Sequence, residues 1–229
     1  MAQGWRTMTG TDLIAAIKGN DMARAKELLR ANPALAKERD ENGVSATMNA
    51  RYRGQTELVE LLLACGVALD VFEAATLGNT ARVTELLDGD PKQVNACSPD
   101  GFTPLHLACF FGQEAVARLL LERGADPGAA ARNPMRVQPL HSAAAGRRLG
   151  IVRVLLERGA PVNGRQHLGW TALHEAANQG NREMAEALLR HGADPAAGND
   201  DGKTPADVAR ERGHTELARL LQQGSRAAG

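Results

Sequence analysis

The sequence predicts an all-α repeat solenoid, in which helix-turn-helix units stack side by side and carry β-turn or hairpin tips. Three observations favour this class. A turn, a short capped helix and a second helix follow one another in residues 100–123, and this unit recurs at a nearly constant spacing along the 229-residue chain. The composition is 43% hydrophobic but only 3% aromatic. Small apolar side chains let short helices approach closely, which suits a stacked solenoid better than an aromatic-rich globule.

The clearest unit begins at the turn dipeptide Asp100-Gly101, where glycine accepts the positive φ of a sharp reversal. Thr103 is expected to cap the first helix with its hydroxyl. His106 follows the cap by three residues, so its ring can bond back to Thr103 as Glu does in a capping box. Gly112 suits the left-handed residue that ends this helix, and the second helix is expected over about 113–123.

The Thr103-Pro104-Leu105-His106 motif returns three times, at successive offsets of 35, 33 and 33 residues by subtraction. The copies are Gln138-Pro139-Leu140-His141, Thr171-Ala172-Leu173-His174 and Thr204-Pro205-Ala206-Asp207. With these copies the chain resembles the ankyrin-repeat family, which has a period of about 33 residues and a T-P-L-H-x-A motif. The resemblance covers nearly the whole chain. It implies a module that recognises a protein or peptide and has no chemistry of its own.

The repeats divide the chain into a flexible N-terminal lead over 1–10, a single ankyrin-type domain over 11–223 and a frayed tail over 224–229. About seven units are expected, at approximately 12–37, 40–69, 70–95, 98–127, 131–163, 166–197 and 200–222. The first unit lacks the turn and the motif, as a terminal repeat with one face in water should. In the second unit the motif is degraded to Ser45-Ala46-Thr47-Met48.

The expected helices follow from caps and breaks. In the first unit Asp12 is expected to cap a helix over 13–18, with its partner over 22–30. In the third unit the turn is missing, and Asp70 is expected to cap a helix over 71–77. This alignment places Phe72 in the slot of His106, as a core residue. The row of turns should therefore have a gap at the third unit.

The fifth unit departs from the pattern at two places. Arg136 replaces the turn glycine, and Arg147 replaces the glycine that ends the first helix. Because arginine rarely adopts a left-handed conformation, the helix break is expected to shift to Gly146 or Gly150. The last unit is expected to end in a polar helix over 215–223.

Charge and cysteine usage exclude several functional classes. Lys plus Arg equals Asp plus Glu at 27 each, so no net field indicates nucleic acid or an anionic membrane as partner. No signal-peptide pattern opens the chain, and no apolar run approaches the length of a membrane span. Cys65, Cys97 and Cys109 are odd in number and far apart in the sequence, so we expect no disulfide framework. We expect a cytoplasmic protein.

The residues that could carry catalysis each have a structural explanation. His106, His141 and His174 recur at one repeat slot, and neighbours at that slot would lie roughly 8–10 Å apart, too far to share a zinc ion. The His174-Glu175-Ala176-Ala177-Asn178 segment has asparagine where the zinc-protease motif needs a second histidine. Gly198 to Thr204 resembles a phosphate loop, but its glycine spacing is wrong. We expect no catalytic, metal-binding or cofactor-binding residues and no cofactor.

The residues that the repeat pattern does not require are more informative. In ankyrin-like stacks, two positions before each inner helix break and the residue before each motif threonine face the concave side. Nearly all aromatic residues fall in these slots, and a large exposed apolar patch usually marks an interaction surface. The candidate partner-binding residues are Tyr52, Arg53, Leu77, Phe102, Phe110, Phe111, Val137, Trp170, Asn178 and Gln179.

Three hypotheses remain open for this surface. The favoured one is a protein–protein interaction module that binds an unidentified protein or peptide. The second is a self-associating structural element or scaffold, in which the apolar band is buried in a homodimer. The third is an enzyme with a site in the groove, for which the sequence offers no acid, base or metal set. A single aromatic such as Phe110 or Phe111 can also be explained as filler beside the missing turn of the third unit.

Overall fold

The computed structural model describes residues 9–227, and the side chains of this range up to Gly224. Within this range, fourteen α-helices form seven consecutive pairs, and the only other helical segments are short 3-10 turns. The all-α prediction of stacked helix pairs is confirmed. The chain divides into two compact units, one made of the residues up to Glu73 together with 98–100, the other of 74–97 and the residues from Gly101 onward.

The first compact unit contains two helix pairs and the start of a third. Its helices are α1 (Gly10–Lys18), α2 (Met22–Ala31), α3 (Ala46–Tyr52) and α4 (Thr56–Ala64), with the beginning of α5 (Val71–Leu77). The N-cap of α1 is Thr9, and Asp12 is the third helical residue, which bonds back to the Thr9 N–H at 2.9 Å. Asp12 therefore closes a capping box and is not the cap that we expected.

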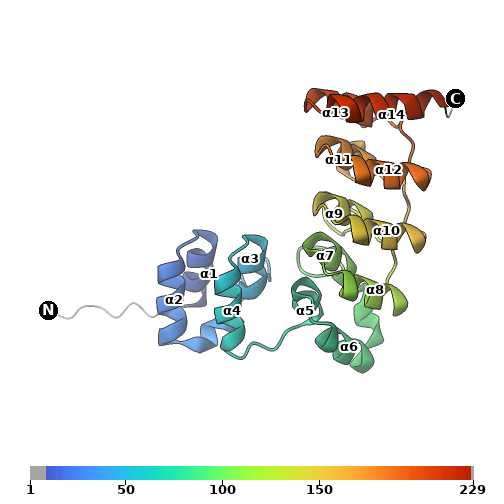
Figure 1. Ribbon diagram of the computed structural model, residues 1–229. Coiled ribbons are helices and arrows are strands. Elements are labelled where there is room, and N and C mark those ends of the chain that lie inside the picture. Colours follow the sequence, from blue (N-terminus) through green and yellow to red (C-terminus); the bar gives the residue numbers. More distant parts are fainter. Residues whose placement is uncertain (1–8, 228–229) are drawn as a thin grey trace. The chain divides into compact units, whose positions relative to one another are not determined.

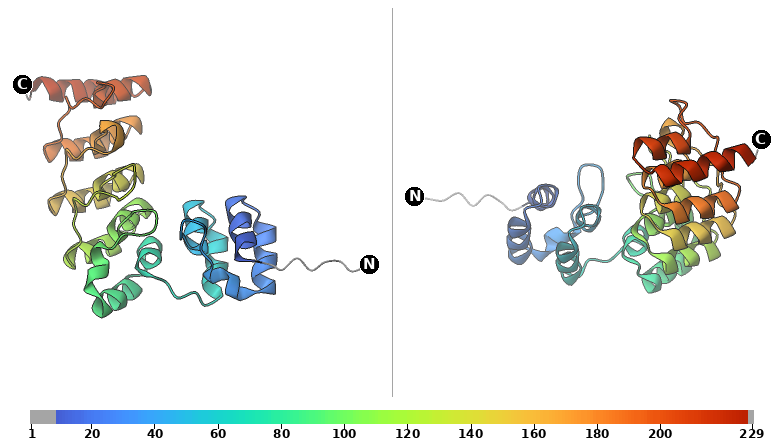
Figure 2. Two further views of the ribbon diagram at one scale, coloured as in Figure 1. Left: turned by 180° about the vertical axis from the view of Figure 1, so that it is seen from behind. Right: turned by 45° about the horizontal axis from the view of Figure 1, so that its top comes forward.

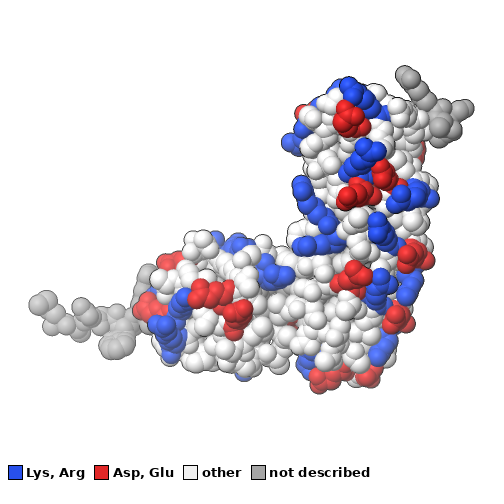
Figure 3. Space-filling model, in the orientation of Figure 1, with Lys and Arg blue, Asp and Glu red and all other residues white. Residues whose placement is uncertain are grey.

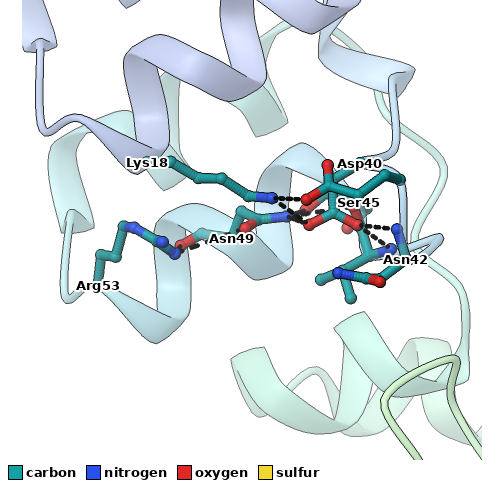
Figure 4. Close-up of polar contacts among 8 residues, drawn as sticks. Lys18, Asp40, Asn42, Ser45, Asn49 and Arg53 are labelled. Atoms are coloured by element: carbon teal, nitrogen blue, oxygen red, sulfur yellow. Dashed lines mark hydrogen bonds and ion pairs between the residues drawn. The ribbon is translucent and has the colours of Figure 1, made fainter.

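Asp40 organises the loop before α3 (Figure 4). Its carboxylate accepts hydrogen bonds from the backbone N–H groups of Asn42 and Val44, from Asn49 Nδ2 at 3.0 Å, and lies 3.1 Å from Lys18 Nζ. Burial alone would raise the pKa of Asp40, but these hydrogen bonds outweigh it and lower the pKa to about 2. The network joins the end of α1 to α3 and fixes the turn.

The second compact unit is a stack of helix pairs. Its helices after α5 are α6 (Thr80–Gly89), α7 (Pro104–Phe111), α8 (Glu114–Glu122), α9 (Pro139–Ala145), α10 (Leu149–Glu157), α11 (Ala172–Asn178), α12 (Arg182–Arg190), α13 (Pro205–Glu211) and α14 (Thr215–Ala227). Figures 1 and 2 show two layers: α7, α9, α11 and α13 follow one another in an inner layer, and their partners α8, α10, α12 and α14 form an outer layer. A loop that we call a finger precedes each inner helix.

The predicted histidine capping box is confirmed. The Thr103 N–H donates to His106 Nδ1 at 3.3 Å, and the His106 N–H donates to Thr103 Oγ1 at 3.4 Å. Since Nδ1 accepts a hydrogen bond, Nε2 carries the proton, and it lies 2.9 Å from the carbonyl oxygen of Val137 in the next finger. The same arrangement repeats at His141 and His174. These histidines hold each repeat to its successor.

Of the expectations about the third helix pair, the cap is confirmed and the placement of Phe72 is wrong. Asp70 caps α5 as predicted, because its carboxylate accepts the Glu73 N–H at 2.9 Å. However, the Glu73 carboxylate in turn accepts a hydrogen bond from the Asp70 N–H at 3.0 Å. Glu73 and not Phe72 therefore occupies the slot of His106. Phe72 is half-buried. The alignment failed by one residue because the loop before Asp70 carries no turn residue that fixes the register.

Two further helix ends differ from expectation. The break after α9 does not move, because Arg147 itself adopts a left-handed φ of 59°. The final helix α14 extends to Ala227, past the expected end at residue 223. Of the expected flexible lead, residues 1–8 lie outside the described residues, and α1 begins at Gly10. Residues 228–229 of the expected tail also lie outside.

Candidate functional site

The inner layer of the second unit buries nearly all of its residues except those at the helix ends. In α7, the residues from Pro104 to Cys109 are buried, whereas Phe110 is 44% exposed. In α9, only Ala145 at the end of the helix is exposed. Scaffold packing therefore accounts for the rest of these helices and leaves their last residues free to serve another purpose.

Phe110 and Phe111 form an edge-to-face pair with ring centroids 5.1 Å apart. Phe111 is half-buried, and Phe110 is the more exposed of the two rings. A fully packed filler would be buried, so the exposure of Phe110 argues against that alternative for this ring. Arg148 from the next repeat donates from Nε to the Phe110 carbonyl oxygen at 3.3 Å.

The aromatic candidates in the fingers are partly used by the scaffold. The Phe102 ring is tilted against His106 with centroids 6.0 Å apart, and Trp170 lies against His174 in the same way at 5.6 Å. Both aromatic rings and Val137 are half-buried. The Phe102 and Trp170 rings thus pack against cap histidines, so part of their role is structural.

Sequence reasoning missed the two most exposed large apolar residues of the second unit. Met135 is 48% exposed and Leu168 is 54% exposed. Both lie at the tips of neighbouring fingers, where the equivalent residues in other fingers are the polar Asn42, Asp100 and Asp201. The replacement of a polar turn residue by an apolar one was the signal that could have found them.

Leu77, Asn178 and Gln179 are half-buried. Gln179 Nε2 donates to the carbonyl oxygens of Ala144 at 3.0 Å and Ala145 at 3.3 Å, so it ties the end of α11 to the end of α9. This contact gives Gln179 a structural role.

Tyr52 and Arg53 belong to the first compact unit, whereas the other eight candidates belong to the second. Tyr52 is 39% exposed, and its hydroxyl donates to Asp100 Oδ2 at 2.6 Å. Partial burial and this hydrogen bond raise the pKa of the Tyr52 phenol. Arg53 is exposed and reaches back to Asn49 (Figure 4).

The charge of the second unit is unevenly distributed. Between Asp126 and Glu157 the sequence has no acidic residue but five arginines: Arg132, Arg136, Arg147, Arg148 and Arg153. Figure 3 shows Lys and Arg side chains, without acidic ones between them, along the edge of the second unit at the level of α7 and α9. The fifth repeat therefore presents a local positive charge in a chain of zero net charge.

Among the described residues, no group of three or more His, Cys, Asp or Glu side chains could hold a metal ion. The hollows are open, and one of about 310 Å³ is lined by Leu87, Asp88, Pro91, Val94 and Arg123, without a convergent acid–base pair. No helix among residues 9–227 is long and apolar enough to cross a membrane.

The structure belongs to the class of α-helical repeat domains in which a loop projects before each helix pair. Its repeated helix pairs, reciprocal Thr–His caps and fingers define this class. A family model described as "Ankyrin repeats (3 copies)" matches residues 71–166 and again 140–227. The chain therefore belongs to the ankyrin-repeat family, as its sequence motif indicated. Domains of this family are generally protein-binding modules and are themselves non-catalytic.

Curated relatives agree with this assignment. The chain is 39% identical over 154 residues to ankyrin repeat and SAM domain-containing protein 6 of Rattus norvegicus, a match that covers 66% of this chain and 14% of that protein. It is 38% identical over 179 residues to human ankyrin repeat and SOCS box protein 3, covering 73% and 34%. A putative ankyrin repeat protein of Escherichia coli, YahD, is 46% identical over 65 residues, covering 26% and 32%. The chain thus spans only about a third or less of these relatives.

Proposed function

We propose that this protein is a non-catalytic interaction module that binds a protein or peptide on the concave surface formed by its inner helix ends and fingers. The observation that carries the proposal is the exposure of Phe110 at the end of a helix whose other residues are buried, except the adjoining Phe111. Exposed aromatic residues on a rigid framework are typical anchors of protein interfaces.

The framework supports this role because it is preorganised. Each cap histidine bonds to the next finger, and Arg148 and Gln179 join successive inner helix ends. A surface fixed in this way loses little conformational entropy on binding, so more of the contact energy remains as affinity. The names of two relatives place ankyrin repeats beside a SAM domain or a SOCS box, an arrangement that fits a recognition module.

A pull-down from lysate of the source cells tests the proposal. The wild-type chain is compared with Phe110→Ala and with Leu121→Ala, a half-buried apolar position on the outer helix α8 of the same repeat. We expect a protein captured by the wild type and by Leu121→Ala but not by Phe110→Ala. Equal capture by all three variants would remove Phe110 from the site.

Self-association is the competing function, because the same exposed rings could be buried between two copies. Sedimentation velocity over a range of protein concentrations distinguishes the two. A concentration-independent monomer supports the module. If the wild type is a dimer and Phe110→Ala is a monomer, the self-associating scaffold and not the interaction module is the function.

A further inference from the structure

Most arginines of the fifth repeat have no acidic partner among the described residues, although Arg158 lies 3.8 Å from Glu122. Arg118 pairs with Glu114 at 2.8 Å, and Arg182 pairs with Glu186 at 2.7 Å. By contrast, the five arginines between Asp126 and Glu157 form no ion pair with any of the described residues; they are Arg132, Arg136, Arg147, Arg148 and Arg153. Unpaired arginines gathered on one repeat leave charge available to a carboxylate from outside the chain.

Two of these arginines hold backbone positions that other repeats give to glycine. Arg136 has a φ of 48°, where the equivalent residues are Gly43, Gly101, Gly169 and Gly202. Arg147 has a φ of 59°, where five other repeats have glycine and the first has Asn20. A left-handed conformation is unfavourable for a residue with a Cβ atom. The scaffold therefore has no use for arginine at either position, and its presence points to an interaction made by the side chain.

Apolar side chains lie next to these charges. Met135 directly precedes Arg136 at the tip of its finger, and the backbone N–H of His167 donates to the Met135 carbonyl oxygen at 2.9 Å. This bond joins the Met135 finger to the finger that carries Leu168. Leu168 also has a left-handed φ, of 61°, and is the most exposed large apolar residue described. We name Arg132, Met135, Arg136 and Leu168 the fingertip patch.

Arginines flank both ends of the inner helix α9. Arg132 and Arg136 precede α9, and Arg147 and Arg148 follow it. A helix of seven residues is about 10 Å long, the reach of about three residues of extended chain. A short extended segment can therefore contact the fingertip patch and the arginines at the far end of α9 together, close to Phe110.

We infer that the second unit binds an acidic protein segment with interspersed apolar side chains, whose carboxylates pair with the arginines around α9 while its apolar side chains pack on Met135 and Leu168. The inference rests on the proposed function and specifies its partner. Guanidinium groups bind carboxylates through paired hydrogen bonds, and aliphatic side chains favour apolar contacts. Single-stranded nucleic acid is usually bound by aromatic stacking in a continuous basic groove, which aliphatic tips do not provide.

Selection from a phage-displayed library of random peptides of about twelve residues, long enough to span α9, tests the inference on the full chain. The variant Arg136→Gly/Arg147→Gly removes two charges and relieves both left-handed arginines. The control Arg30→Gln/Arg190→Gln removes two exposed arginines outside the fifth repeat, on α2 and α12, that form no ion pair with a described residue. Fluorescence anisotropy then measures the selected peptides, and a single-stranded DNA of similar length serves as the nucleic acid probe.

We expect selected peptides rich in Asp, Glu and large apolar residues. Their affinity should fall roughly tenfold or more in Arg136→Gly/Arg147→Gly, which corresponds to about 1.4 kcal/mol, and stay within about twofold in the control. The melting temperature of the glycine variant should be equal to or above that of the wild type, since a scaffold role would lower it. Selection of neutral or basic peptides, equal losses in both variants, or tighter binding of the DNA would each overturn the inference.

The proposed function can survive this failure. Suppose that Phe110→Ala abolishes capture of a protein from lysate while no acidic peptide is selected. The proposal of an interaction module is then supported, and the inference of an acidic partner is wrong. If neither experiment detects binding, both the function and the inference fail.

Discussion

His106 Nε2 lies 2.9 Å from the carbonyl oxygen of Val137, so the histidine that closes the cap of one repeat also holds the finger of the next. His141 and His174 bond in the same way to Gly164 at 3.1 Å and Lys203 at 3.0 Å. The three histidines link the fourth to the seventh repeat. Because Nδ1 of each ring accepts a backbone N–H, a second proton on the ring would break the cap.

Stability should therefore fall in mild acid. Burial lowers the pKa of His106, His141 and His174, and that of His141 is lowered to about 4. A group with a depressed folded pKa contributes stability above its unfolded pKa of about 6.5 and loses it as the pH falls towards the folded pKa. From His141 alone we expect a loss of about 2 kcal/mol between pH 7 and pH 5. Urea unfolding followed by circular dichroism across this range measures the free energy of unfolding. A free energy that does not change with pH would contradict the interpretation that the cap histidines are buried and neutral.

The cap histidine should matter far more than an exposed histidine of the same region. His141→Ala leaves the Gln138 N–H and the Gly164 carbonyl without their partner and creates a cavity, so we expect a loss of about 2–4 kcal/mol. His167→Ala, at an exposed finger position, should change stability by less than about 0.5 kcal/mol. Chemical unfolding of both variants checks the contrast, and similar losses would show that the cap has no special weight.

Removing a left-handed arginine should not weaken the fold. Arg136→Gly relieves the strain of a φ of 48°, and the gain offsets the greater freedom of glycine in the unfolded chain, for a net change of about 0 to 1 kcal/mol in favour of folding. At the equivalent position of the fourth repeat, adding a Cβ atom by Gly101→Ala should lower the free energy of unfolding by roughly 1–3 kcal/mol. There a Cβ atom would lie 2.7 Å from the backbone of Arg132, at a φ of 88°. Differential scanning calorimetry of the two variants should show melting temperatures that shift in opposite directions.

Phe110 should be dispensable for folding. Its ring is 44% exposed, so we expect Phe110→Ala to reduce stability by no more than about 1 kcal/mol. Leu107→Ala in the same helix removes a side chain that is only 3% exposed and should cost about 2–5 kcal/mol. Thermal unfolding compares the pair. A large loss in Phe110→Ala would place this ring among the structural residues.

The repeat fold could be predicted from the sequence because its signals are local. Thr103, His106 and Gly112 each determine the conformation of their own turn, and the structure places all three as expected. The prediction failed where the local rule was broken. Arg147 was expected to move the helix break, but packing across the stack holds it in the left-handed conformation, as the close approach of Gly146 to the Phe110 carbonyl shows.

The candidate site was harder to predict, since exposure depends on contacts between repeats. Aromatic content drew attention to Phe102 and Trp170, which the structure packs against histidines, and away from Met135 and Leu168, which it leaves more exposed. Nothing in the local sequence revealed that Gln179 would bond to the preceding helix end. The absence of acidic residues between Asp126 and Glu157 was visible in the sequence. It was overlooked because basic and acidic residues are equal in number over the whole chain.

We propose that the exposed face around Phe110 contacts a partner protein. Photo-crosslinking tests it most directly, with a photoreactive phenylalanine derivative placed at Phe110 and, as the control, at the exposed Arg190 of the outer helix α12. We expect a distinct adduct with another protein from position 110 alone, reduced by excess unmodified wild-type chain but not by excess Phe110→Ala. No adduct at position 110, or the same adducts from both positions, would contradict it.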